Sequence, residues 1–326
     1  MRVSPAVATL CVIGSGLCAA AEPQSAAAQP FPTKTMRMIV SYAPGGTVDI
    51  IARIVSTKLS ENLGQQIIVD NRAGGGATIG TQAFAKSLPD GYTMMLANPA
   101  HAANPALNAK LPYDTLKNFS GVGLVAVSAS ILVVHPSMPV KTVRELVTLA
   151  KANPGQLNYA SSGVGGAGYL AMELFKSHTG IEVVHVPYKG AAPALTDVLG
   201  GQVPMMFITT PAAMPYVKAG RLRVLGVSSA KRNFMLPQVP TIAESGYPGF
   251  ENADWYGLVV PSGVPKEIIA RLNAETNRAL ALAEIRERIN ALGAEVAPGT
   301  PEQLDERIRS EVARWSRIIK QPVTDK

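Results

Sequence analysis

Short apolar runs alternate with amphipathic stretches along the chain from Met36 onward. The run MRMIVSY ends at a Pro-Gly-Gly turn, and the stretch TVDIIARIVSTKLSENLG that follows has apolar residues at helical spacing. Short apolar runs bounded by glycine predict strands, and longer periodic stretches predict helices. QQIIVDNRAGGG, ATIGTQAFAKSLPDG and YTMMLANPA continue the alternation of strand and helix. This order predicts a parallel sheet with helices on its faces.

A second series of the same kind begins at ILVVHP. It continues with a predicted helix at TVRELVTLAKANPG, a strand at LNYASSG and a helix at GYLAMELFKSHTG, followed by IEVVHVPYKG, AAPALTDVLGGQ, VPMMFITT and RLRVLGVSS. Two α/β series of similar pattern predict two lobes. A proline-rich segment without periodicity, residues 235–250, then leads to a strand at WYGLVVP. Two helices with polar faces, at 266–282 and 301–320, are expected to cover the sheets rather than form another domain.

The first 28 residues differ in kind from the rest. Arg2 precedes an apolar stretch, Ala6 to Leu17, and an alanine-rich segment without basic residues follows it. This pattern predicts a secretory signal peptide cleaved near Ala21 or Ala28 and therefore an exported, periplasmic protein. A buried or membrane-lying helix and a lipid anchor at Cys18 are the alternatives, although the bulky Leu17 disfavours the anchor.

Both cysteines of the chain, Cys11 and Cys18, fall within this segment, so the mature protein is expected to lack disulfides and cysteine metal ligands. The net charge of +7 comes from scattered basic residues without a basic run. Such a distribution suits a small anion better than nucleic acid, which we do not expect as a partner. Beyond the leader, no apolar run reaches the roughly 18 residues of a membrane-spanning helix.

Three glycine-rich loops each join a predicted strand to a predicted helix: Pro44-Gly45-Gly46, Gly74-Gly75-Gly76 and Gly163 to Gly168. The first N–H groups of a helix have no partner within the helix and carry partial positive charge, so such loops bind anions. Ligands of open α/β sheets lie at the carboxyl ends of the strands, where these loops are expected. A single loop of this kind is explained as a tight turn. Loops from two lobes facing each other favour an anion site.

Gly163-x-Gly165-x-x-Gly168 has the spacing of the dinucleotide-binding fingerprint. The residues before it, Asn158 to Ser162, do not form the continuous apolar strand that the fingerprint requires. The next strand ends at Lys189 without the acid that would hold a ribose. An NAD site is therefore disfavoured, and no cofactor is expected.

The polar residues of the sequence carry no other enzyme signature. The four histidines show no metal-ligand spacing, and no G-x-S-x-G turn precedes a helix. Asp49, just after the first glycine turn, is expected to favour the helix N-terminus and hold the loop in place rather than act as a base. We therefore expect neither a metal site nor catalytic residues.

Several segments, in order along the chain, resemble the Bug-type substrate-binding proteins of tripartite tricarboxylate transporters. They are SYAPGGTVDIIAR, VDNRAGGGATIGTQAFAKSLPDGYTMML, VPYKGAAPALTDVLGGQVPMMF, KAGRLRVLGVSSAKR and YGLVVPSGVP. The resemblance runs from about Pro32 to the C-terminus. It implies a two-lobed, type II periplasmic binding protein that closes on its ligand, each lobe a mainly parallel sheet with flanking helices. Lobe 1 would comprise residues 31–127 and 250–326, and lobe 2 residues 128–249.

The resemblance also implies where a ligand carboxylate would bind: between the first loop and the glycine-rich loop of lobe 2, with further walls after two strands. Carried onto this chain, these positions are Tyr42, Ala43, Gly45, Gly46, Thr47, Val48 and Asp49; Ser161, Ser162, Gly163, Gly165, Gly166, Ala167 and Tyr169; Asn98, Pro99, Ala100 and His101; and Thr209 and Thr210. The implied partners are a small organic carboxylate and either the membrane subunits of a tripartite tricarboxylate transporter or a sensor kinase. A monomer without enzymatic activity is expected.

The sequence departs from the family pattern at three positions. Relatives often have serine and histidine where this chain has Gly166 and Tyr169, and many carry an aspartate where it has Ile208. An aspartate would suit a ligand ammonium, so its absence disfavours an amino acid. The larger ring of Tyr169 suits a bulkier or aromatic carboxylate.

Overall fold

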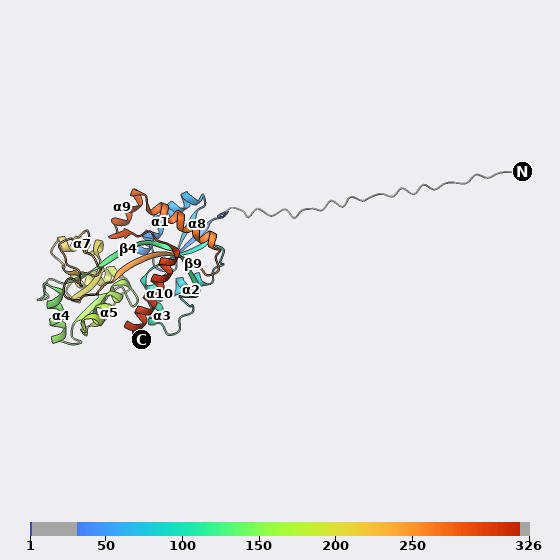
Figure 1. The fold of residues 1–326 in the computed structure, drawn as a ribbon. Helices are drawn as coiled ribbons and strands as arrows, with labels where there is room; N and C mark the ends of the chain where they lie inside the picture. The colour runs from blue at the N-terminus through green and yellow to red at the C-terminus, as the bar shows by residue number, and fades with distance from the viewer. Residues whose placement is uncertain (2–30, 320–326) are drawn as a thin grey trace. The chain divides into compact units, whose positions relative to one another are not determined.

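Met1 and residues 31–319 are described by the structure, a computed structural model (Figure 1). The predicted cleavage sites and both cysteines lie outside the described residues. From Pro32 onward the chain forms one compact unit, in which ten strands make a single connected sheet.

The first group of strands contains the segments that the amino-terminal pattern predicted. Its order is β2 (Ile67–Asn71), β1 (Met36–Val40), β3 (Thr93–Ala97), β9 (Ala253–Pro261) and β4 (Phe119–Val134). β1 pairs in parallel with β2 and with β3, because α1 (Thr47–Leu63) and α2 (Thr78–Ala85) return the chain to the same edge. A short strand, β10 (Ala294–Val296), pairs with β4.

The second group continues the sheet from the far end of β4. Its order is β7 (Met205–Thr209), β5 (Asn158–Ser161) and β6 (Val184–Pro187), and β8 (Arg223–Val227) also pairs with β4. Four helices belong to this part of the chain: α4 (Val143–Ala152), α5 (Ala167–Thr179), α6 (Ala191–Leu199) and α7 (Thr210–Lys218). β5 pairs in parallel with both β6 and β7.

β4 joins the two groups. Its residues from Phe119 to Ala129 pair with β9, and its residues from Ser130 to Val134 pair with β7. The sequence predicted only the end of this strand, ILVVHP. The pairings of β4 with β9, β7 and β8 are all antiparallel, so the sheet is more mixed than the predicted parallel pattern. A two-lobed α/β fold results, with β4 and β9 as the strands that run between the lobes (Figure 1).

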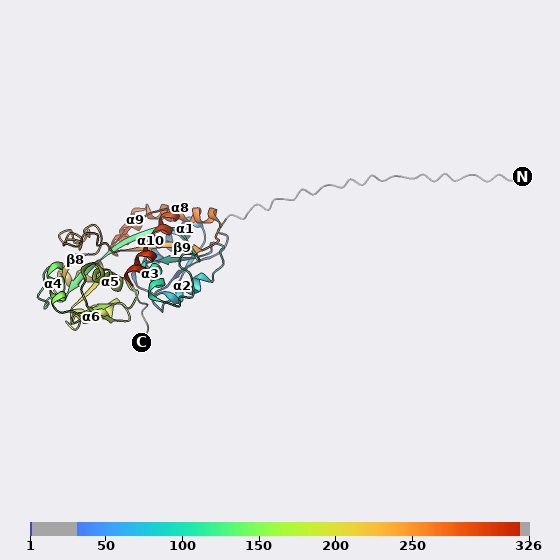
Figure 2. The ribbon, with the colours of Figure 1, turned by 60° about the horizontal axis from the view of Figure 1, so that its bottom comes forward.

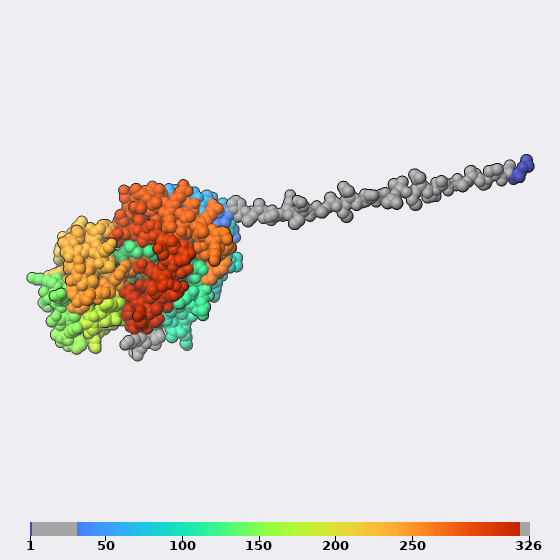
Figure 3. All heavy atoms as spheres, in the orientation of Figure 1, coloured from blue at the N-terminus to red at the C-terminus, as the bar shows by residue number. Residues whose placement is uncertain are grey.

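The C-terminal helices cover the first group of strands. The sequence pattern predicted helices that cover the sheets but did not predict which group they cover. α8 (Lys266–Leu280) and α9 (Ala283–Asn290) pack on α1, and α10 (Pro301–Ile318) packs on β4 and on α3 (Pro99–Leu107). A capping box between Thr300 and Gln303 begins α10. This helix covers the middle of the face shown in Figure 3 and lies across β9 in Figure 2.

The short helices α3 and α7 were not predicted from the sequence. Each contains an internal proline, Pro105 or Pro215, which disfavours a helix by propensity. No helix in residues 31–319 combines the length and the apolar character that a membrane crossing requires.

Candidate ligand-binding site

The first glycine loop is held in place by Asp49, which is buried in the first turn of α1. The Gly45 N–H donates to Asp49 Oδ2 at 2.9 Å, Arg53 Nε donates to the same oxygen at 3.0 Å, and Asn71 Nδ2 donates to Oδ1 at 2.8 Å. Burial alone would raise the pKa of Asp49, but these three donors together hold the pKa below its ordinary value. The predicted role of Asp49 in fixing the loop is confirmed. All its carboxylate oxygens are engaged within the protein.

The loop itself presents backbone to solvent. Ala43, Gly45 and Gly46 are exposed, and Thr47 is partly exposed. Gly45 has a φ of +88°, and Gly46 caps α1 in an extended conformation, so the first N–H groups of α1 point out of the helix without intrahelical partners. These groups are what an anion would bind.

Tyr42 and Asn98 lie together at the carboxyl ends of β1 and β3. The Tyr42 hydroxyl is 3.2 Å from Asn98 Oδ1 and 3.0 Å from Asn98 Nδ2, and both residues are partly buried. Burial raises the pKa of Tyr42 to about 12, so its hydroxyl remains a hydrogen-bond donor at neutral pH. Two of the predicted contacts thus form one polar pair beside the first loop.

The second glycine loop is organised by Ser161, the last residue of β5. The Gly163 N–H donates to Ser161 Oγ at 3.0 Å, and Ser161 Oγ lies 2.7 Å from His185 Nε2. The imidazole of His185 is stacked against Tyr159 and tilted against Tyr169, with ring centroids 4.9 Å apart in each pair. Burial lowers the pKa of His185 to about 4, so the ring is neutral at pH 7.

The glycine spacing in this loop has a packing explanation. Gly163 and Gly165 have φ values of +113° and +78°, which favour glycine. A Cβ on Gly168 would lie 2.5 Å from the Phe207 carbonyl oxygen, so Gly168 permits the close approach of α5 to β7. The resemblance to a dinucleotide fingerprint therefore arises from a tight turn and close helix–strand packing.

The second loop also touches the first group of elements. A Cβ on Gly76 would lie 3.4 Å from the Val164 carbonyl oxygen, and a Cβ on Gly165 would lie 3.3 Å from Leu107 Cδ1. Asn104 on α3 donates to the Gly76 carbonyl at 3.1 Å and so holds that turn in position. The glycine loops of the two lobes thus meet at residues 76 and 164–165.

Two of the predicted residues have other partners in the structure. His101 is 2% exposed, packs edge-on against Phe119 at 5.0 Å between ring centroids, and has no hydrogen-bond partner on either nitrogen within the described chain. Burial lowers its pKa to about 4. Thr210 is fully buried, and its hydroxyl accepts from Asn233 Nδ2 at 3.1 Å. Both side chains belong to the protein interior, so we leave them out of the proposed contacts. The remaining residues of the two loops stay predictions.

Comparison with known proteins identifies the family. Residues 51–323 match the family model described as the tripartite tricarboxylate transporter family receptor. The chain belongs to this family.

Individual relatives match over most of their length. Protein BugT of Bordetella pertussis is 35% identical over 314 residues, covering 96% of each chain. The solved structure of R. palustris Rpa4515 with adipate is 37% identical with a TM-score of 0.80, covering 89% of this chain and 97% of that one. MatC from Rhodopseudomonas palustris with bound malate is 32% identical with a TM-score of 0.79, covering 89% of this chain and 100% of that one. The two-lobed periplasmic binding fold predicted for this receptor is thereby confirmed.

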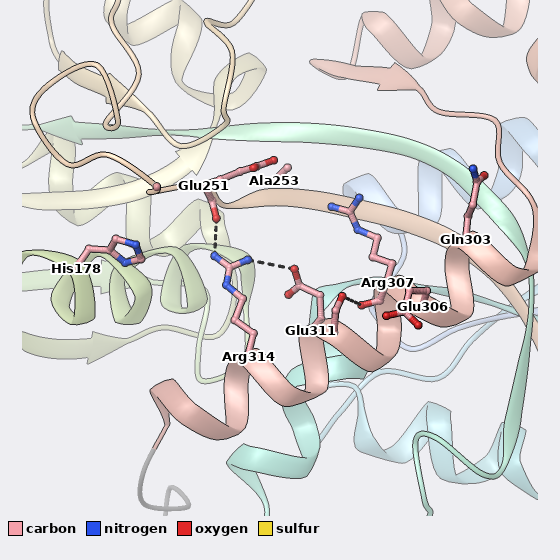
Figure 4. Close-up of a pocket in the computed structure, with 10 residues that line it drawn as sticks. His178, Glu251, Ala253, Gln303, Glu306, Arg307, Glu311 and Arg314 are labelled. Carbon is pink, nitrogen blue, oxygen red and sulfur yellow. Dashed lines mark hydrogen bonds and ion pairs between the residues drawn. The ribbon is translucent and has the colours of Figure 1, made fainter.

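A separate hollow of about 510 Å³ lies against α10 and the segment before β9 (Figure 4). Charged side chains line it, and they pair with one another: Arg314 donates to Glu311 Oε1 at 3.1 Å and to the Glu251 carbonyl. None of the predicted contacts lines this hollow. It therefore lies apart from the candidate site.

The sequence reasoning missed three residues that the structure places in or beside the site: His185, Ser130 and Asp254. His185 lies 24 residues from Ser161 and shows no motif with it, and the other two lie on the strands that run between the lobes. Among the described residues, no group of three or more histidine, cysteine or acidic side chains has the geometry of a metal site.

Proposed function

We propose that this receptor is an exported, periplasmic protein that binds a small organic carboxylate between its lobes and presents it to the membrane subunits of a tripartite tricarboxylate transporter. One observation carries the proposal. Two helix starts rich in glycine, one exposed at α1 and one partly buried at α5, leave backbone N–H groups without intrahelical partners and available to an anion. The relatives solved with adipate and with malate support a dicarboxylate as the ligand.

The proposed lobe boundaries follow the point at which β4 changes from pairing with β9 to pairing with β7. We assign residues 31–127 and 250–326 to lobe 1 and residues 128–249 to lobe 2, with residues 1–28 as a cleaved leader. The assignment is supported by the change of partner between Ala129 and Ser130 and by the start of β9 at Ala253. Hinge closure about these two strands would bring the loops together on the ligand.

We propose binding without catalysis, although Ser161 and His185 are hydrogen-bonded. The Ser161 side chain is fully buried, and in residues 31–319 no carboxylate is hydrogen-bonded to His185 Nδ1. A nucleophilic serine needs an accessible oxygen and an oriented base. The pair instead fixes the loop through Gly163.

A ligand screen tests the proposal. Binding to the folded state alone raises stability by RT ln(1 + [L]/Kd), which is about 2.7 kcal/mol at a hundredfold excess over Kd. We expect adipate, malate or another dicarboxylate to raise the melting temperature of the purified monomer, and calorimetry to give one site per chain. Tricarboxylates, aromatic acids and amino acids complete the panel. A melting temperature unchanged by every acid would contradict the proposal.

The alternative partner of the ligand-bound protein is a membrane sensor kinase. The same ligand would bind in both cases, so calorimetry does not separate them. Ligand uptake by membrane vesicles that contain the transporter subunits, with and without this receptor, does. Uptake that is unaffected by the receptor would favour the sensor.

A further inference from the structure

Asp254 lies on β9 at the point where the two lobes join. It pairs directly with Ser128 on β4, and Ser130, the next residue on the same face of β4, donates its hydroxyl to Asp254 Oδ2 at 3.3 Å. Ser130 in turn pairs with Thr209, one of the predicted contacts of lobe 2. A single residue, Ser130, therefore links Asp254 to Thr209, a predicted ligand contact of lobe 2.

The same carboxyl group also interacts electrostatically with two tyrosine hydroxyls. Its charge acts on the hydroxyls of Tyr42 and Tyr256 and contributes to the raised pKa of each. Tyr42 is hydrogen-bonded to Asn98, and Tyr256 to Ser128. Asp254 is thus linked to predicted contacts of both lobes, to Thr209 through Ser130 and to Tyr42 through its charge.

This carboxyl group has no cationic partner. It is 3% exposed, and within residues 31–319 no lysine, arginine or histidine forms an ion pair with it. Glu311 on α10, whose charge acts on Asp254, is itself negative. Two arginines of that helix, Arg314 and Arg307, interact with Glu311 and Glu251, and a third, Arg309, pairs with Glu306. A buried, unpaired carboxylate is costly, so the group favours its neutral form.

We propose that Asp254 is a specificity-determining residue of the ligand site: it is protonated when an anionic carboxylate occupies the cleft, so that ligand capture takes up a proton. Burial raises the pKa of Asp254 to about 7, opposed in part by the Ser130 hydroxyl and aided by Glu311. The neutral acid does not repel an incoming anion, whereas the ionised acid does. An anion in the cleft therefore raises this pKa further and draws a proton from solvent.

This inference rests on the proposed function, and it is tested by calorimetry with adipate or malate in buffers of different ionisation enthalpy. We expect the wild-type protein to take up a proton on binding at pH 7.5 and to lose up to about tenfold in affinity for each pH unit above the pKa. Asp254→Asn should bind the same dicarboxylate without proton uptake and with little change between pH 7 and 9. Ser130→Ala should shift to higher pH the point at which the affinity for the dicarboxylate begins to fall.

A matched control is Asp305→Asn. Asp305 is a half-buried acid whose pKa is also raised by burial, and it accepts from the Gly121 N–H at 2.7 Å, seven residues before Ser128 on β4. This variant should keep the wild-type proton uptake, because Asp305 does not face Asp254. Loss of uptake in both variants would overturn the assignment.

Other outcomes separate the failure of this inference from that of the proposed function. Dicarboxylate binding without proton uptake overturns the role of Asp254 and leaves the proposed function standing. No binding by the wild-type protein at any pH overturns both. If Asp254→Asn loses affinity only for ligands that carry an ammonium group, such as aspartate, then Asp254 is an ionised counter-ion and the proton-coupled role is wrong.

The unliganded protein gives a second readout. A folded pKa above the unfolded value means that the native state binds more protons between the two pKa values, so the stabilising contribution is present at low pH and is lost as pH rises from about 4 to about 7. Asp254→Asn should therefore melt at a higher temperature than wild type at pH 8, with a smaller difference at pH 5. Equal melting temperatures at pH 8 would overturn the buried, unpaired state on which the inference depends.

Discussion

Individual side chains of this receptor hold the backbone of the two glycine loops in position. Both carboxylate oxygens of Asp49 accept hydrogen bonds, from Gly45, Arg53 and Asn71. The Ser161 hydroxyl accepts from the Gly163 N–H and is also hydrogen-bonded to His185. Free backbone N–H groups at helix starts need such support, because an anion site gains affinity when its donors are already in place before binding. The contribution of these residues to affinity is therefore expected through loop geometry.

Gly46 provides a test of the first loop. It has a φ of −79°, and the nearest atom to an added Cβ is the Ala43 carbonyl oxygen at 3.9 Å, so a larger residue fits the unliganded loop. Gly46→Val should destabilise the fold by about 1 kcal/mol at most, because valine is a poorer N-cap than glycine. Its β-branched side chain should cover the helix start and weaken dicarboxylate binding by about tenfold or more in calorimetry, a loss of about 1.4 kcal/mol.

The control for Gly46→Val is Gly200→Val. Gly200 ends α6 at a φ of −85°, and an added Cβ would be no nearer than 3.5 Å to another atom. Affinity should be unchanged in this variant. Wild-type affinity in Gly46→Val would remove the first loop from the site.

At the scale of elements, close approach between a helix and a strand sets the position of the second loop. α5 follows the loop directly, and its first turn rests on β7 at Gly168. The position of the loop therefore depends on how closely α5 packs against β7. The three glycines that resemble a nucleotide fingerprint serve this packing and the turn before it.

Gly168→Ala is expected to push α5 away from β7. The added methyl group would lie 2.5 Å from a backbone oxygen, which does not move as a side chain end does. Overpacking of this kind destabilises by roughly 1–3 kcal/mol, which urea unfolding would measure as a lower midpoint. Gly200→Ala, with ordinary contact distances, should leave the midpoint nearly unchanged. A wild-type midpoint in Gly168→Ala would show that the helix has room to shift.

At the scale of the whole molecule, the two lobes touch at two places besides the strands that join them. Gly76 meets Val164 on one side, and Gly293, between α9 and β10, meets Pro211 at the start of α7 on the other. Residues of lobe 1 and lobe 2 are thus in contact at both of these places. Closure of the lobes is therefore expected to depend on small residues at both places.

Gly293→Ala tests the second contact. The new Cβ would lie 2.4 Å from Pro211 Cδ, so the lobes must separate there, and we expect ligand affinity to fall by about tenfold, or about 1.4 kcal/mol. Gly293 has a φ of +65°, so alanine also adds backbone strain of roughly 1 kcal/mol. The double variant Gly293→Ala, Pro211→Ala keeps the strain and removes the clash. Recovered affinity in the double variant is expected, and equal affinity in both variants would contradict the role of this contact.

Much of the architecture followed from the sequence, because local pattern and local chemistry decide it. Alternation of apolar runs and periodic stretches predicted the strands and helices of both α/β series, and an acid placed early in a helix after a glycine turn predicted the role of Asp49. The family resemblance predicted the two-lobed fold. The glycine loops were recognisable because several of their positions, among them Gly45, Gly163 and Gly165, have positive φ values that favour glycine.

Long-range pairing decided the rest. The exchange of partners by β4, the Ser161–His185 pair and the placement of Asp254 all depend on residues distant in sequence. His101 shows the same limit of prediction from sequence. Its position after a strand favoured a place in the cleft, but in the structure it is packed against Phe119 in the core. The sequence by itself determined the elements and the loops able to bind an anion. Only the tertiary structure decided that Asp254 is buried without a cationic partner among the described residues, because burial and pairing are properties of the assembled chain.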